Sequence, residues 1–335
     1  MIKFNINILF RSFISLFFLL AALYFLDWMK IKQYVSFIHL NIFILTIIFH
    51  MVVIAILSLR WYCLINSIVK LPVIDHIERY LYSLYLNIFT PANVGSDIYR
   101  VVSLKKNIKS SLPILIIIFK EHFIGLLSHL FFYIICIIGL WYLSVDIILR
   151  STHFFLIPTI VILMTAASLL FTSVIIRFFL NITFIRSHDF INKTLNHILK
   201  VVIFSSKSEF FILIGLSFLA FIIRTIIFQQ IAINLNIEIS SITLGVFFVL
   251  VELARMIPLS IQGIGVREAM WAYMIEMLGG SSEKGFVLGT VVYISLSIAM
   301  MLSGLIGWGL IYFRDKNSYN DVEKNEHVHE VNISD

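Results

Sequence analysis

Two breaks in the apolar sequence contain residues suited to binding an anion. In the first, Pro91 ends one helix and Gly95 provides a turn before the next, because proline lacks an N–H donor and glycine tolerates tight backbone conformations. Arg100 follows within the new helix. A helix N-terminus exposes unpaired N–H groups, and a nearby arginine adds positive charge. This break therefore predicts binding of a phosphate or carboxylate.

The second break repeats the same elements closer to the C-terminus. Its residues are Pro258, Gln262, Gly263, Gly265, Arg267 and Glu268. The two glycines allow a ligand close to the backbone, and Glu268 suits the first turn of the following helix electrostatically. The alternative interpretation is that proline and glycine only form connectors and that the arginines lie at the headgroup level. The repetition of the arrangement favours a ligand site.

Further ionisable residues lie inside apolar segments, where each costs at least ~2.5 kcal/mol unless it faces a cavity or a partner. Glu121 interrupts an otherwise apolar helix from Leu112 to Leu143, with no opposite charge at helical spacing. Its alternative role is that of an interfacial residue at a helix start. Glu252 and Arg255 share a helix face and can pair, which makes them either substrate contacts or a structural ion pair. Arg224 lies near the middle of an apolar run.

The elements that position these residues must be membrane helices. The chain has 335 residues, 60% of them hydrophobic and 13% charged, whereas a soluble domain is about a quarter charged. A membrane span needs about 20 apolar residues, and six runs meet this length. They are Ile8–Leu26, Gln33–Leu59, His122–Val145, Ser151–Ile176, Phe210–Ile237 and Gly285–Phe313. This composition excludes a soluble globular domain, a disordered chain and a coiled-coil rod.

Two apolar stretches, residues 80–119 and 239–280, contain the breaks and need not cross the membrane. If the six runs cross, each stretch begins and ends on one side and dips into the membrane as a hairpin, one from each face. Opposed broken segments are typical of inverted-repeat transporters. We therefore predict an all-α polytopic membrane protein with six full spans and two broken or re-entrant segments. The alternative is that both stretches cross fully, giving eight helices.

The distribution of charge predicts the orientation. Lys and Arg gather in residues 60–109 and 177–209, which the positive-inside rule places in the cytoplasm together with both termini. This pattern explains the net charge of +6 without nucleic acid binding. We expect one transmembrane domain, residues 1–313, and a disordered acidic tail, residues 314–335. No motif predicts a metal, a nucleotide or another cofactor.

The motifs at the two breaks resemble those of the lysylphosphatidylglycerol synthase membrane-region family, whose members are also called flippase-like domain proteins. The family's C-terminal motif is matched at Pro258, Ser260, Gly263, Gly265, Arg267 and Glu268. Gln262 replaces the first of its paired glycines. The family's earlier motif is matched at Thr90, Pro91, Gly95, Arg100 and Glu121. Ser96 stands where Glu is common, and His122 where Arg is common.

This resemblance implies a multi-pass inner-membrane protein that moves a polar-headed lipid between leaflets. The expected partners are membrane lipids with an anionic or polyprenyl phosphate headgroup, such as an aminoacyl-phosphatidylglycerol, a glycolipid or a polyprenyl-linked sugar. We expect no aminoacyl-transferase domain and no lysine transfer by this chain. Arg100, Arg255 and Arg267 would hold the lipid phosphate, and Glu121 would balance their charge or receive a cationic headgroup. The alternatives are an integral membrane enzyme that uses Glu121 and His122 as acid and base, or a non-catalytic scaffold.

Overall fold

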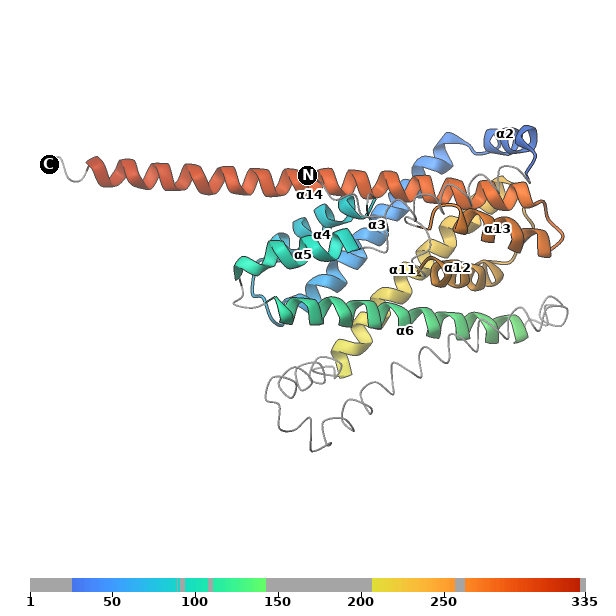
Figure 1. Ribbon diagram of the computed structural model, residues 1–335, viewed down its shortest axis with the longest axis horizontal. Coiled ribbons are helices and arrows are strands. Elements are labelled where there is room, and N and C mark those ends of the chain that lie inside the picture. The colour runs from blue at the N-terminus through green and yellow to red at the C-terminus, as the bar shows by residue number, and fades with distance from the viewer. Residues whose placement is uncertain are drawn as a thin grey trace, which may run out of the picture.

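The computed structural model describes residues 26–88, 90, 94–107, 111–142, 207–256 and 263–331. Within these ranges it contains helices and no strand (Figure 1), which confirms the predicted all-α class. The helices are α2 (Trp28–Ser36), α3 (Leu40–Ile65), α4 (Val73–Asn87), α5 (Val94–Leu104), α6 (Leu112–Tyr142), α11 (Lys207–Asn234), α12 (Ser241–Met256), α13 (Val266–Met277) and α14 (Ser282–Val331). A short 3-10 turn, Lys105–Asn107, follows α5.

Four helices are long and apolar enough to cross a membrane. Their candidate spans are Leu40–Ile65 in α3, Pro113–Tyr142 in α6, Ser208–Asn234 in α11 and Ser282–Arg314 in α14. They correspond to four of the six runs predicted from hydropathy. The other two, residues 8–26 and 151–176, lie outside the described residues except for Leu26.

The other five described helices are too short to cross alone, and four of them, α4, α5, α12 and α13, form two pairs. The longest of them, α12, has 16 residues and is about 24 Å long at 1.5 Å per residue, against a hydrocarbon core of roughly 30 Å. In the first pair, α5 folds back against α4, so that Ser96 contacts Ser83 and Tyr99 contacts Tyr82. We call residues 73–104 the first hairpin, and residues 241–277, which contain α12 and α13, the second hairpin.

The two hairpins enter the bundle from opposite ends. At one end, Lys120 near the start of α6 pairs with Glu209 at the start of α11, and Arg314 of α14 pairs with Glu78 of α4. The first hairpin begins and ends here, and we call this the α4 end. At the other end, the α2 end, Lys284 of α14 donates to the Asn236 carbonyl after α11. The second hairpin begins and ends there, as the re-entrant prediction requires.

Two predicted boundaries are wrong. The stretch 80–119 was expected to form one broken segment, but residues 112–119 belong to α6, which continues without interruption through Glu121. The predicted span ends at Leu59, but α3 extends through Arg60 to Ile65. The physical reason is the same in both places, because Arg60 and Glu121 form an ion pair inside the bundle and so need not lie at a helix end.

Helix α14 packs against both hairpins (Figure 1). Close approach depends on glycine at two places. A Cβ on Gly307 would lie 2.6 Å from the Tyr82 backbone nitrogen in α4, and a Cβ on Gly285 would overlap the Trp271 carbonyl in α13. Small residues at such contacts let membrane helices approach closely. This single helix therefore joins the two hairpins.

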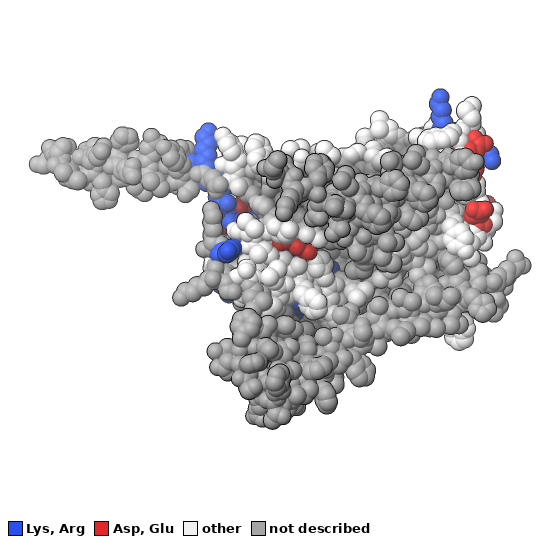
Figure 2. All heavy atoms as spheres, viewed as in Figure 1, with Lys and Arg blue, Asp and Glu red and all other residues white. Residues whose placement is uncertain are grey.

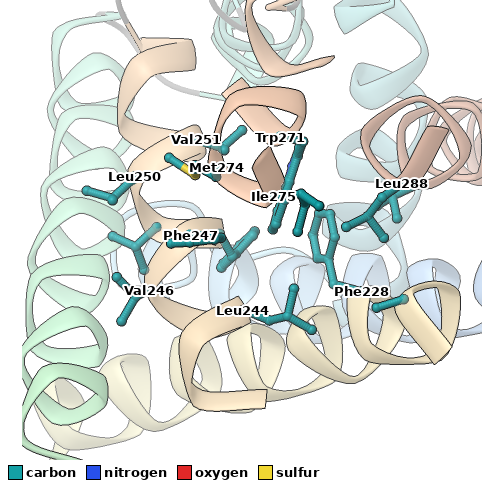
Figure 3. Close-up of a cluster of buried hydrophobic side chains, with 14 of the residues drawn as sticks. Phe228, Leu244, Val246, Phe247, Leu250, Val251, Trp271, Met274, Ile275 and Leu288 are labelled. Carbon is teal, nitrogen blue, oxygen red and sulfur yellow. The ribbon is translucent and has the colours of Figure 1, made fainter. Parts of the chain in front are cut away.

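The largest cluster of buried apolar side chains surrounds the second hairpin (Figure 3). Trp271 of α13 is 1% exposed and stacks on Phe228 of α11 with ring centroids 4.5 Å apart. Phe247 of α12 meets the same indole edge-on at 6.2 Å. Offset and edge-on aromatic contacts of this kind add to the stabilisation from burial alone. The second hairpin is thereby fixed to α11 by its apolar faces.

Beyond the apolar bundle, α14 continues as helix to Val331. The domain boundary at residue 313 and the disordered tail stay predictions. No glycine or proline follows Gly309 before Val331, so no residue of those two types ends the helix. Figure 2 shows several basic side chains, with acidic ones beside them, where α14 leaves the bundle, and side chains of both signs at the α2 end.

Candidate functional site

A cavity of about 190 Å³ lies where the two hairpins meet. Arg100, Glu121, Glu252 and Arg255, four of the six residues predicted to bind substrate, line this cavity. The other polar groups around it are Arg60, Tyr80, Asn87, Ser96, His122, His129 and Arg224. The cavity thus brings together segments that are far apart in the sequence, and we call it the hairpin cavity.

Glu121 links three helices at the edge of the hairpin cavity. Its carboxylate accepts from Arg100 Nη1 at 2.5 Å and lies 3.4 Å from Arg60 Nη2. Arg60 also donates to the Ser217 hydroxyl on α11 at 2.9 Å. All three charged residues are at most 8% exposed. A buried charge that loses its partner is strongly destabilising, so this cluster fixes α5 and α3 against α6.

Arg100 has a second carboxylate partner. Its Nη2 donates to Asp97 at 2.6 Å, and its guanidinium stacks over Trp61 at 4.3 Å from the ring centroid. His122 Nε2 lies 3.0 Å from the other Asp97 oxygen. Arg100, which is predicted to bind phosphate, therefore lines the cavity. Its guanidinium group is already paired with two carboxylates.

The first break is closed by side chains of the preceding segment. The Gly95 N–H donates to Thr90 Oγ1 at 3.0 Å, and the Ser96 N–H donates to Asn87 Oδ1 at 2.9 Å. Such capping satisfies donors at a helix start that have no partner in the helix. These two N–H groups are therefore not free to bind a ligand, contrary to the sequence prediction. Pro91 lies outside the described residues.

The second break begins α13 with two glycines in the left-handed region, Gly263 at φ 76° and Gly265 at φ 84°. The Glu268 carboxylate accepts from the Gly265 N–H at 2.7 Å. Glu268 thus caps its own helix, as its predicted place in the first turn indicates, and it is not among the residues lining the hairpin cavity. Pro258 and Gln262 lie outside the described residues.

Arg255 and Glu252 form the predicted ion pair, with Arg255 Nη2 2.7 Å from Glu252 Oε2. They lie beside Arg224, which the sequence places inside an apolar run without assigning it a role. Arg224 lies 5.9 Å from the Phe248 ring centroid, and within the described segments it makes no salt bridge and its Nε has no hydrogen-bond partner. It is ten residues before the end of α11, or about 15 Å from that end.

The balance of charge in the hairpin cavity favours an anion. Of the described residues that line it, four carry guanidinium groups, namely Arg60, Arg100, Arg224 and Arg255, and two carry carboxylates, namely Glu121 and Glu252. Among the residues that the structure describes, no group of three His, Cys, Asp or Glu side chains is placed to hold a metal ion. The cavity's own chemistry is therefore that of a partly neutralised arginine cluster, which suits a phosphate or carboxylate.

Arg267 occupies a different place from the other predicted ligands. It lines a second, smaller cavity of about 30 Å³ that adjoins the hairpin cavity and shares Arg224 and Glu252 with it. Its guanidinium lies over the Tyr293 ring, 3.9 Å from the centroid. The six predicted ligands are thus divided between one large cavity, one small cavity and one helix cap.

Sequence reasoning missed the contributions of Arg60 and Asp97 and left Arg224 without a role. A signal for Arg60 is present, because no glycine or proline separates it from the preceding apolar run and the helix has no reason to end before it. Asp97 lies three residues before Arg100, a spacing that places both on one helix face. No comparable local signal shows that Arg224 would meet the second hairpin.

The family model described as Lysylphosphatidylglycerol synthase TM region matches residues 8–315. No curated protein and no solved structure matches the chain significantly. The matched range contains both hairpins, the four candidate spans and every residue that lines the hairpin cavity. The match therefore covers the whole candidate site.

Proposed function

The chain belongs to the lysylphosphatidylglycerol synthase TM region family, and we propose that it moves the headgroup of a phosphate-bearing lipid between membrane leaflets. Family membership supports a membrane protein with a lipid-related role. The observation that carries the more specific proposal is the hairpin cavity, because it lies between two hairpins that enter from opposite ends and has more guanidinium groups than carboxylates. Opposed broken segments commonly meet at the substrate site of transporters.

The proposed path lets the polar headgroup pass through protein while the lipid tails stay in the surrounding hydrocarbon. A phosphate at the bilayer centre is costly without compensating charge. Arg224 and Arg255 would supply that compensation near the middle of the bundle, and Arg224 is the cavity arginine without a salt bridge among the described residues. Arg60 and Arg100 would stay with Glu121 and hold the first hairpin in place.

The cavity size is compatible with a phosphate and a small headgroup. A single water needs roughly 10–15 Å³ of comparable space, and the hairpin cavity has about 190 Å³. Aminoacyl-phosphatidylglycerol, a glycolipid and a polyprenyl-linked sugar all have a phosphate or an equivalent polar headgroup that would occupy the cavity. The proposed setting is the cytoplasmic membrane, with the α4 end and both termini facing the cytoplasm, because basic side chains gather at that end.

The same geometry gives less support to an integral membrane enzyme. Glu121 is bound by Arg60 and Arg100, so its carboxylate is already engaged by two guanidinium groups. His122 lines the cavity and contacts Asp97, so acid chemistry on a bound lipid is the remaining route. Recovery of chemically unchanged lipid after transport distinguishes the transporter from this enzyme.

The proposal is tested by leaflet exchange of fluorescent phosphatidylglycerol and of a labelled polyprenyl phosphate in vesicles containing purified protein. Wild-type protein should accelerate exchange of at least one of these lipids, and Arg224→Gln should reduce the rate to that of protein-free vesicles. Arg79→Gln is the matched control, since Arg79 pairs with Asp75 and Glu78 and does not line the cavity. Normal exchange in an inserted Arg224→Gln protein would contradict the phosphate site.

A further inference from the structure

The smaller cavity, which we call the Arg267 cavity, is a site in its own right. It has about 30 Å³ of space and lies between α3, α11, α12, α13 and α14. This is room for about two water-sized particles at roughly 10–15 Å³ each. Its polar lining comes from His50, Arg224, Glu252 and Arg267, and most of the rest is apolar or aromatic.

Arg267 is buried without enough hydrogen-bond partners. Its side chain belongs to a residue that is 6% exposed, and both Nε and Nη2 lack a hydrogen-bond acceptor in the part of the chain that the structure describes. Arg224 Nε has no acceptor there either. Buried donors that remain unpaired cost about 1–3 kcal/mol each, and more when charged. Two guanidinium groups with unused donors on one small cavity indicate a missing acceptor.

The charges around the Arg267 cavity leave one positive charge in excess. Among the described residues that line the cavity, Arg224 and Arg267 carry positive charge and Glu252 carries negative charge. Glu252 is engaged by Arg255 at 2.7 Å, and Glu268 accepts from the Gly265 N–H at 2.7 Å. Water molecules would satisfy the free donors but not the charge. A single monovalent anion would satisfy both.

We propose that the Arg267 cavity binds a small inorganic monovalent anion of the halide type, held between Arg267 and Arg224. The space excludes a phosphodiester with its two substituents, because it holds only about two water-sized particles. Aromatic residues complete the wall, and ring edges carry the positive part of the aromatic quadrupole. Phe228, Phe248 and Trp271 supply these rings. This site shares Arg224 and Glu252 with the hairpin cavity, and anion binding to it does not require lipid transport.

The first test measures the unfolding temperature of detergent-purified protein in sodium chloride and in sodium gluconate at equal ionic strength, without phosphate. A ligand that binds only the folded state raises this temperature saturably. We expect a rise of at least roughly 2 °C with chloride relative to gluconate. The rise should be lost in Arg267→Gln and kept in Arg79→Gln, whose arginine lies outside both cavities.

A second readout uses Trp271, which lines the cavity. Iodide bound there should quench its fluorescence saturably, whereas Trp28, Trp141 and Trp308 are exposed and should show only linear collisional quenching. Trp271→Phe should remove the saturable part. This titration uses the wild-type protein, so it tests the site even if Arg267→Gln fails to fold.

The outcomes separate a free anion from a lipid phosphate. Chloride-specific stabilisation that depends on Arg267, together with saturable iodide quenching that short-chain phosphatidylglycerol does not displace, supports the small-anion site. Absence of any chloride-specific shift in the wild-type protein overturns it. Displacement of iodide by short-chain phosphatidylglycerol also overturns it and assigns the cavity to the lipid phosphate.

Discussion

The two hairpins look alike in sequence but are stabilised in different ways. The first contributes Arg100, which is matched by Glu121 and Asp97, and its helix start is capped by Thr90 and Asn87. The second contributes an arginine whose Nε and Nη2 have no hydrogen-bond partner among the described residues, and its nearest carboxylate in sequence is used as a cap. Ion pairs and hydrogen bonds stabilise the first hairpin, whereas aromatic packing stabilises the second hairpin.

This difference teaches that a repeated motif need not repeat its chemistry. Arg100 and Arg267 each follow a proline and glycine break, so the sequence predicts the same role for both. In the fold, Arg100 is a structural partner that also borders the hairpin cavity, and Arg267 faces a separate small cavity. Free positive charge at the hairpin cavity comes instead from Arg224, which belongs to neither hairpin.

The largest effect should follow from removing the α6 carboxylate that binds the first hairpin. Glu121→Gln leaves the buried guanidinium groups of Arg60 and Arg100 without their shared partner. Breaking one member of a buried ion pair typically costs about 3–5 kcal/mol. Denaturant or thermal unfolding in detergent measures the loss. A Glu121→Gln protein as stable as Glu268→Gln, in which only a helix cap is weakened, would contradict the contrast between the hairpins.

The second prediction compares how the hairpins pack on α14. Gly307→Ala places a Cβ against the α4 backbone, and Gly285→Ala places one against the α13 backbone, so each should cost about 1–3 kcal/mol by overpacking. Gly309→Ala is the control because no atom lies within 4 Å of its Cβ position. This control should be neutral or slightly stabilising in unfolding experiments. Equal effects at all three glycines would show that α14 does not join the hairpins.

Much of the fold could be predicted from local sequence. Uncharged runs locate the four described spans, and the residues at Pro91 and Pro258 locate the two breaks. The start of α6 and the end of α3 could not be placed in this way, because they depend on the pair between Arg60 and Glu121, which are 61 residues apart in sequence. From sequence alone, a charged residue in an apolar run predicts a helix end, and only its partner in the fold shows that the helix continues.

The candidate site was predictable in kind but not in arrangement. Glu252 and Arg255 pair as their three-residue spacing predicts, because both partners lie on one helix. The division of Arg100 and Arg267 between two cavities depends on contacts with α6, α11 and α14, which no local pattern encodes. For the same reason, the sequence shows Arg224 as an isolated charge in an apolar run but does not predict its position between the two cavities.

A smaller effect should come from the cap of the first hairpin. Asn87→Ala removes the acceptor for the Ser96 N–H, and loss of a cap of this kind costs about 1 kcal/mol. Hydrogen exchange should then become faster at the start of α5. Asn234→Ala provides a control, because its amide donates to the Gln230 carbonyl on its own helix. Unchanged exchange at α5 in Asn87→Ala would contradict the capping role.

The smallest effect on stability should be that of Arg267→Gln in a medium without halide. The substitution removes a buried charge that has no salt bridge with the described residues, and such a charge contributes little or costs stability. We expect the unfolding temperature in gluconate to stay the same or rise. A loss as large as that of Arg100→Gln would show that Arg267 has a strong partner and that the two hairpins are alike.

The central claim, that a lipid headgroup passes through the hairpin cavity, is tested most directly by blocking that cavity. Gly125 lines it, and a Cβ there would meet no atom closer than Arg60 Nη1 at 4.0 Å, so Gly125→Cys should fold. In a background without Cys63 and Cys136, the thiol is labelled with a sulfonatoethyl methanethiosulfonate, and leaflet exchange is measured before and after labelling. Asn107→Cys, at an exposed position, is the labelled control.

We predict that labelling at Gly125→Cys stops lipid exchange and that labelling at Asn107→Cys leaves it unchanged. Phosphatidylglycerol or polyprenyl phosphate should also slow the labelling of Gly125→Cys if the headgroup occupies the same space. Undiminished exchange in protein that is fully labelled at Gly125→Cys would contradict the account.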